Sequence, residues 1–66
     1  MGYRIKELRE SLNMTQEELS RKSDVSRGTI SALENGTERT TTTKTLMRIA
    51  NALGTTVDRL FYPMSV

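Results

Sequence analysis

The feature that most constrains this chain is a pair of helix-start signals that follow one another closely, at Thr15 and Ser26. Thr15 and Glu18 have the spacing of a capping box, in which each side chain accepts a hydrogen bond from the backbone amide of the other residue. Ser26 is a second favoured N-cap residue. We therefore expect one helix over residues 16–23 and another over residues 27–35, joined by a short turn, which is a helix-turn-helix.

Apolar residues around both caps support this prediction. Met14 precedes the first cap and Leu19 lies at the fourth helical position, while Val25 and Ile30 repeat the arrangement around the second cap. Each pair has the spacing of a hydrophobic staple, which fixes the angle at which the chain enters the helix. Asp24 lies in the turn, where a left-handed backbone is needed and where Asp is one of the few tolerated residues. The two helices should therefore pack against each other through these side chains.

A further helix is predicted before this pair, over residues 3–12. Ile5, Leu8 and Leu12 follow one another at three- and four-residue spacing. This spacing gives a helix one apolar face, so we expect all three side chains to point toward the core.

Two more helices are predicted after the pair, over residues 43–53 and 57–62. Either Thr42 or Thr43 is the expected N-cap of the first, and Thr56 is the expected N-cap of the second. No internal repeat or interdomain linker interrupts the sequence. The prediction is one compact all-α domain of five short helices that takes up the whole chain.

Composition narrows the range of functions. The chain has 66 residues, no cysteine and no histidine, so it lacks thiolate and imidazole groups, which are common metal ligands and catalysts near neutral pH. We expect no metal, no cofactor, no small-molecule site and no enzymatic activity. No apolar run is long enough to cross a membrane and the N-terminal stretch does not have the pattern of a signal peptide, so a cytoplasmic location is expected. The net charge of +2 permits an anionic partner without requiring one.

Taken together, these motifs resemble a known family. The stretch "TQEELSRKSDVSRGTISALENG", followed by "TLMRIANALGTTVDRLF", is similar to the Cro/repressor type of helix-turn-helix domain found in lambdoid phage repressors. The resemblance extends from Ile5 to Phe61. It implies a lambda-repressor-like fold that binds double-stranded DNA, with the third helix in the major groove. Two departures are Asp24, where family members often have glycine, and a run of threonines in place of a proline before the fourth helix.

The resemblance also implies roles for individual residues. Arg27, Gly28, Thr29 and Ala32 would face the base edges from the recognition helix. The alternatives are that Arg27 is solvated or holds only a phosphate, and that Thr29 and Ala32 are small surface residues. Contacts with the DNA backbone are expected from polar residues at helix starts and in the loop after the recognition helix: Gln16, Ser26, Asn35, Arg39, Thr42, Thr43 and Lys44.

Gly28 lies in the first turn of the recognition helix. Its missing side chain costs about 1 kcal/mol of helix stability relative to alanine, and it leaves Arg27 as the only long side chain at this tip. We expect alanine at this position to be tolerated for folding and a bulky residue to impair DNA binding first.

Two further expectations concern the support of the interface. The resemblance implies an ion pair between Arg9 and Glu34, which would position the recognition helix.

A domain this small reads few base pairs, so we expect a homodimer that acts as a repressor on a near-palindromic site. The apolar C-terminal end is a candidate dimer surface: Val57, Phe61, Tyr62 and Met64. The alternative is that Val57 and Phe61 complete the core. The rival function is a protein-interaction module, such as an antitoxin or adaptor, on the same scaffold.

Overall fold

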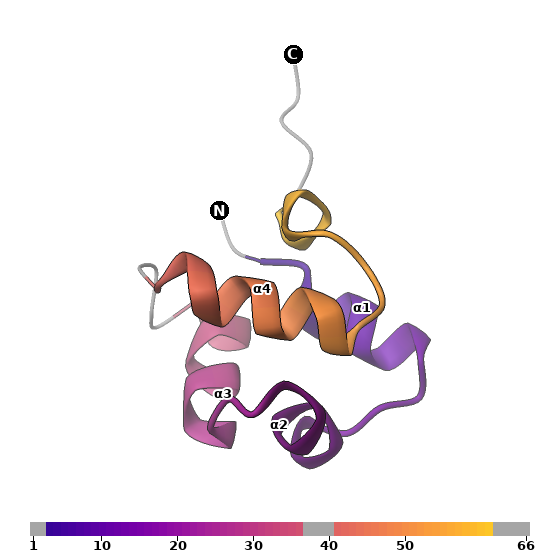
Figure 1. Cartoon of the computed structure of the whole chain (residues 1–66). Helices are drawn as coiled ribbons and strands as arrows, with labels where there is room; N and C mark the ends of the chain where they lie inside the picture. The colour runs from indigo at the N-terminus through magenta and orange to yellow at the C-terminus, as the bar shows by residue number, and fades with distance from the viewer. Residues whose placement is uncertain (1–2, 37–40, 62–66) are drawn as a thin grey trace.

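A computed structural model describes residues 3–36 and 41–61. Within them the chain forms four α-helices and one short 3-10 helix: α1 (Ile5–Ser11), α2 (Gln16–Ser23), α3 (Arg27–Asn35), α4 (Thr43–Ala52) and η1 (Val57–Leu60). Figure 1 shows α4 running across the middle of the molecule, with α2 and α3 below it and η1 above it. The predicted all-α architecture is confirmed for the described residues.

The predicted caps account for where α2, α3 and α4 begin. Thr15 and Glu18 form both hydrogen bonds of the capping box. The Ser26 hydroxyl accepts a hydrogen bond from the Thr29 amide, and the Thr42 hydroxyl, rather than that of Thr43, caps α4. Local sequence therefore determines these three helix starts.

The turn between α2 and α3 is held by side chains as well as by its backbone. Asp24 has φ 58°, which confirms the predicted left-handed conformation. The Ser20 hydroxyl donates to the Val25 carbonyl over 2.7 Å, and the buried Ser23 hydroxyl donates to the Leu19 carbonyl over 2.6 Å. The Val25 amide in turn donates to the Ser23 hydroxyl over 3.3 Å. Side-chain hydrogen bonds therefore tie the turn to the end of α2.

The first predicted helix is shorter than expected, because α1 covers only Ile5–Ser11 of the predicted 3–12. Asn13 has φ 56° and turns the chain immediately after the helix. Leu12 therefore leaves the apolar stripe and is 51% exposed, which makes its predicted burial wrong. Leu8 packs half-buried against the core.

The prediction of a fifth α-helix over residues 57–62 is also wrong. The segment forms a single 3-10 turn, and the Thr56 side chain makes no capping hydrogen bond. Phe61 is extended and pairs with Tyr3 in an isolated bridge, while the Arg4 amide donates to the Leu60 carbonyl over 2.6 Å. Pairing with the N-terminal segment thus takes the place of a further helical turn, and Tyr62 lies outside the described residues.

The core lies between the helix-turn-helix and the remaining elements. α4 packs on α2 and η1 packs on α4. Val57 is half-buried against this core, which favours the core alternative for that residue. Within the part of the chain that the structure describes, no helix is long and apolar enough to cross a membrane. The fully buried side chains come from every element: Ile5, Leu19, Ile30, Leu33, Ile49 and Leu60.

Candidate nucleic-acid interface

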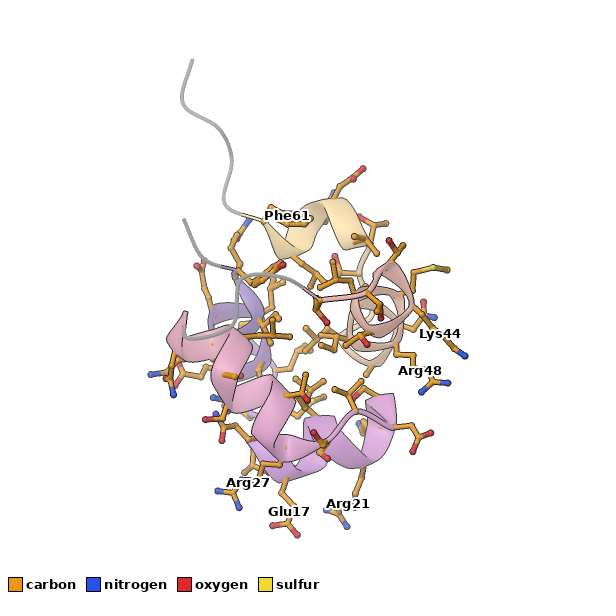
Figure 2. All side chains as sticks on the ribbon, turned by 90° about the vertical axis from the view of Figure 1, so that its left-hand side faces the viewer. Glu17, Arg21, Arg27, Lys44, Arg48 and Phe61 are labelled. Carbon is orange, nitrogen blue, oxygen red and sulfur yellow. The ribbon has the colours of Figure 1, made fainter. Side chains whose placement is uncertain are left out.

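The exposed tip of α3 is formed by its first turn. Arg27 is exposed and extends away from the body of the domain (Figure 2). Over residues 3–36 and 41–61, its guanidinium has no hydrogen bond or ion pair. A cation without a partner among these residues is available for a contact outside them.

Gly28 follows Arg27 on the exposed surface. A Cβ built at Gly28 meets nothing within 4 Å, so no packing contact requires glycine here. The backbone φ of Gly28 is not in the left-handed region. Among the described glycines, only Gly36 and Gly54 have a positive φ. Neither turn geometry nor close packing within the domain explains this glycine.

The two other residues predicted to face bases are less exposed. Thr29 and Ala32 are half-buried. The Thr29 hydroxyl accepts a hydrogen bond from the Ser26 hydroxyl over 2.8 Å, so both hydroxyls belong to the cap of α3. The Thr29 O–H, one lone pair on each hydroxyl and the Thr29 methyl group remain for an external partner.

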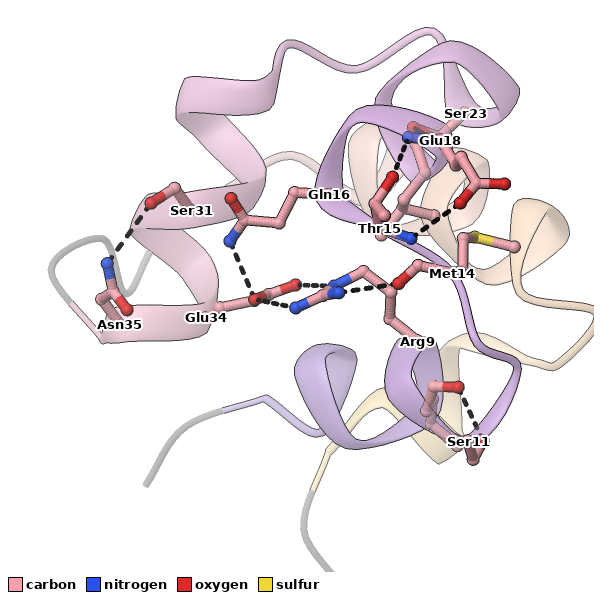
Figure 3. A network of polar contacts seen from close by, with 12 residues as sticks. Arg9, Ser11, Met14, Thr15, Gln16, Glu18, Ser23, Ser31, Glu34 and Asn35 are labelled. Atoms are coloured by element: carbon pink, nitrogen blue, oxygen red, sulfur yellow. Dashed lines mark hydrogen bonds and ion pairs between the residues drawn. The ribbon is translucent and has the colours of Figure 1, made fainter.

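A buried polar network holds the C-terminal part of α3 against α1 and α2 (Figure 3). The Arg9 guanidinium donates from Nε to Glu34 Oε2 over 2.9 Å and from Nη2 to Glu34 Oε1 over 3.1 Å, and from Nη1 to the Met14 carbonyl over 2.7 Å. The Gln16 side-chain amide donates to Glu34 Oε1 over 3.0 Å. The pairing of Arg9 with Glu34 inferred from the sequence is thus present, and Gln16 joins it.

This network differs from a surface ion pair in its burial. The Glu34 side chain is 1% exposed and that of Arg9 is 11% exposed. The hydrogen bonding that Arg9 donates to Glu34 raises the pKa of Arg9, although burial acts in the opposite direction. A charge this deep is stable only while its partner is present. The network therefore fixes the position of α3 relative to the first two helices.

The start of α4 presents the remaining predicted contacts. Thr42, Thr43 and Lys44 are exposed there, and Lys44 extends away from the domain in Figure 2. At the other end of α3, the Asn35 side-chain amide donates to the Ser31 hydroxyl over 3.3 Å. Of the predicted backbone contacts, Arg39 lies outside the described residues, as does Met64 of the candidate dimer surface.

Sequence reasoning missed two charged residues near these elements. Arg48 lies one turn after Lys44 on α4, and its guanidinium is 3.8 Å from the Asp24 carboxylate across the exposed turn. Glu17 lies on the outer surface of α2, close to the start of α3. The position of Arg48 could have been found from its helical spacing to Lys44, whereas that of Glu17 relative to α3 depends on tertiary packing.

A shallow hollow of about 610 Å³ separates the start of α2 from the tip of α3. It opens beside Arg27 and reaches inward to the buried network. Among the described residues, eight line it: Arg9, Glu10, Asn13, Met14, Thr15, Gln16, Glu17 and Arg27.

A family model described as helix-turn-helix matches residues 5–60, which covers all the elements above. No curated protein and no solved structure matches the chain.

Proposed function

The chain belongs to the helix-turn-helix family of the Cro/C1 type, a family of DNA-binding domains, and on that premise we propose that it is a transcriptional repressor that reads a specific DNA sequence through α3. The observation that carries this proposal is the contrast within α3. Its C-terminal part is held by the buried Glu34, while its first turn presents Arg27, which has no partner among the described residues, beside a glycine. A rigid helix with a free cation at its tip suits insertion into the major groove.

Arg27 is the residue to which we assign base recognition. A guanidinium can donate two hydrogen bonds to O6 and N7 of guanine, which contributes about 1–3 kcal/mol of discrimination. The absence of a side chain at Gly28 lets the helix backbone approach the base edges closely. Thr29 and Ala32 would offer small apolar contacts, such as to a thymine methyl group.

Backbone contacts would supply most of the affinity. Lys44 and the hydroxyls at the start of α4 are exposed, and the helix start adds a partial positive charge that attracts phosphate. Ser26 offers a hydroxyl at the start of α3. The Gln16 amide is partly used by Glu34, which leaves one N–H for a phosphate oxygen. Binding of this kind is strongly salt-dependent, because it releases counterions from the DNA.

We propose that two copies act together on a near-palindromic site, with half-sites about one helical turn apart. The support for this is size, since one recognition helix contacts only a few base pairs. Phe61 is 45% exposed, and the centroid of its ring lies 5.2 Å from that of the half-buried Tyr3. An accessible aromatic ring of this kind is suited to an interface between subunits.

The experiment is a titration of the purified protein against random-sequence duplex DNA at two salt concentrations. We expect binding at low salt that weakens several-fold at higher salt. Absence of binding, or binding indifferent to salt, would reject the proposal in favour of a protein-interaction module on the same scaffold.

A further inference from the structure

A carboxylate stands among the cations at the edge of the proposed interface. Glu17 lies between Arg27 and Arg21 along the lower edge of the domain in Figure 2. Glu17 and Arg21 are four residues apart on α2 and share a helix face, and Glu17 lines the same hollow as Arg27. An acidic group at this position opposes the attraction of DNA phosphates that the proposed function requires.

The structural role of Glu17 is small. The capping box of α2 is formed by the next residue, Glu18. Glu17 is exposed, and over the described ranges 3–36 and 41–61 it has neither a hydrogen bond nor an ion pair. Its position in the first turn favours a carboxylate through the helix dipole, but that effect is worth only a few tenths of a kcal/mol at an exposed site.

The charges around the hollow show what a phosphate would meet there. The guanidinium of Arg9 is already neutralised by Glu34. The charged side chains that remain on the lining are the carboxylates of Glu10 and Glu17 and the guanidinium of Arg27. Unless Arg27 compensates, the hollow repels a phosphate that approaches the start of α2.

Arg27 can provide that compensation in one geometry. A guanidinium that bridges O6 and N7 of guanine uses two of its five N–H donors, and the remaining donors stay available to an acceptor on the protein side. Glu17 borders the same hollow and has no other partner among the described residues, so its carboxylate can accept from Arg27 in the docked state. On DNA that lacks the correct base, this arrangement does not form and the repulsion remains.

We propose that Glu17 is a positioning residue that sets the specificity of the interface: its carboxylate repels backbone phosphate on every duplex and orients Arg27 only where Arg27 docks on its base. This inference rests on the proposed function. It explains why a mildly charged domain would retain an acidic group at a DNA-facing edge. The role is selectivity, because the carboxylate lowers affinity for random DNA more than for the correct site.

The test compares Glu17→Gln with the wild type on two duplexes, one obtained by binding-site selection with the wild-type protein and one of random sequence. The substitution removes one charge and keeps the size of the side chain. We expect affinity for random DNA to rise roughly threefold to tenfold at low salt, the effect of one charge several ångströms from a phosphate in a mostly aqueous setting. Affinity for the selected duplex should rise by clearly less, so the ratio of the two affinities falls.

Two further variants separate positioning from net charge. Asp58→Asn removes the same charge from η1, at the opposite end of the domain from α2 in Figure 1, and should leave the affinity ratio unchanged. In an Arg27→Ala background, Glu17→Gln should strengthen binding to both duplexes by the same factor, since no guanidinium is left to orient. Circular dichroism of each variant confirms that the helices are retained.

Three results would overturn the inference. The first is an equal gain in affinity on both duplexes, and the second is an affinity ratio no different from that of Asp58→Asn. The third is a loss of affinity that is larger on the selected duplex than on random DNA and that persists in the Arg27→Ala background. The last result would mean that Glu17 contacts a base itself. If the wild type shows no salt-dependent binding, the proposed function fails and the role of Glu17 fails with it. A wild type that binds, with an unchanged ratio in the variant, rejects only the role of Glu17.

Discussion

Arg27 and Glu34 lie on the same face of α3, about two helical turns apart, and their surroundings are opposite. Glu34 is 1% exposed and accepts hydrogen bonds from both Arg9 and Gln16. Arg27 is exposed and extends into solvent without a partner among the described residues. The buried charge fixes where the helix lies, and the free charge is left to act on whatever the helix meets. Positioning and recognition are thus assigned to different ends of one helix.

The largest expected effect comes from breaking the buried end. Glu34→Ala leaves the Arg9 guanidinium buried without a counter-charge, so the free energy of unfolding should fall by about 3–5 kcal/mol. Urea unfolding followed by circular dichroism measures the loss. If this variant does not fold, Glu34→Gln takes its place, because it keeps the shape of the side chain and one acceptor. Its loss in the free energy of unfolding should be smaller than that expected for Glu34→Ala. A loss below about 1 kcal/mol for Glu34→Ala would mean that the pair behaves as a surface ion pair.

Breaking the free end should affect binding and leave folding intact. Arg27→Ala removes the proposed guanine contact, so discrimination between selected and random duplexes should fall by about 1–3 kcal/mol. The unfolding midpoint in urea should stay within error of the wild type, because the side chain has no partner among the described residues. Fluorescence anisotropy on both duplexes gives the discrimination. Equal loss on the two duplexes would show that Arg27 holds a phosphate instead of reading a base.

Substitutions at Gly28 sharpen the comparison, because they should affect the stability of the fold and the affinity for DNA in opposite directions. Gly28→Ala places a methyl group in open space and should raise the free energy of unfolding by up to about 1 kcal/mol. Gly28→Leu should fold as well as the alanine variant but bind DNA much more weakly than the wild type, because its side chain separates the helix from the base edges. Unchanged DNA binding by the leucine variant would remove Gly28 from the interface.

The capping box should add a small dependence of stability on pH. Hydrogen bonds from the Thr15 amide and hydroxyl lower the pKa of Glu18 below its ordinary value of 4.5. A carboxylate with a lowered pKa in the folded state stabilises the fold above its unfolded pKa, and this contribution is lost as the pH falls through the folded pKa. The difference in unfolding midpoint between the wild type and Glu18→Gln should therefore shrink as the pH drops below 4.5. A difference that stays constant from neutral to acidic pH would contradict this origin.

Local chemistry explains which parts of this fold could be predicted from the sequence. The capping box at Thr15, the cap at Ser26 and the left-handed Asp24 depend on neighbouring residues, and all three are confirmed. The prediction for Leu12 is wrong because the chain already turns at Asn13, and the prediction for the last helix is wrong because the C-terminal segment pairs with the N-terminal one.

The same distinction between local and tertiary interactions applies to the candidate site. The pairing of Arg9 with Glu34 came from resemblance to a family, since no local rule connects residues that far apart in the chain. The position of Glu17 beside Arg27 follows from the packing of α2 on α3. Sequence spacing could assign Glu17 only to an exposed helical turn, so the acidic group at the edge of the proposed interface emerged from the structure.

In the proposed function, the first turn of α3 contacts DNA while the buried network holds the helix from within the domain. The most direct measurement is amide chemical-shift mapping of the isotope-labelled protein during titration with the selected duplex. We predict the largest shifts over residues 26–32, at Gln16 and Glu17 and at the start of α4, with α1 and η1 little changed. Shifts concentrated on η1 and Phe61, with α3 unaffected, would contradict the claim and place the binding surface elsewhere on the domain.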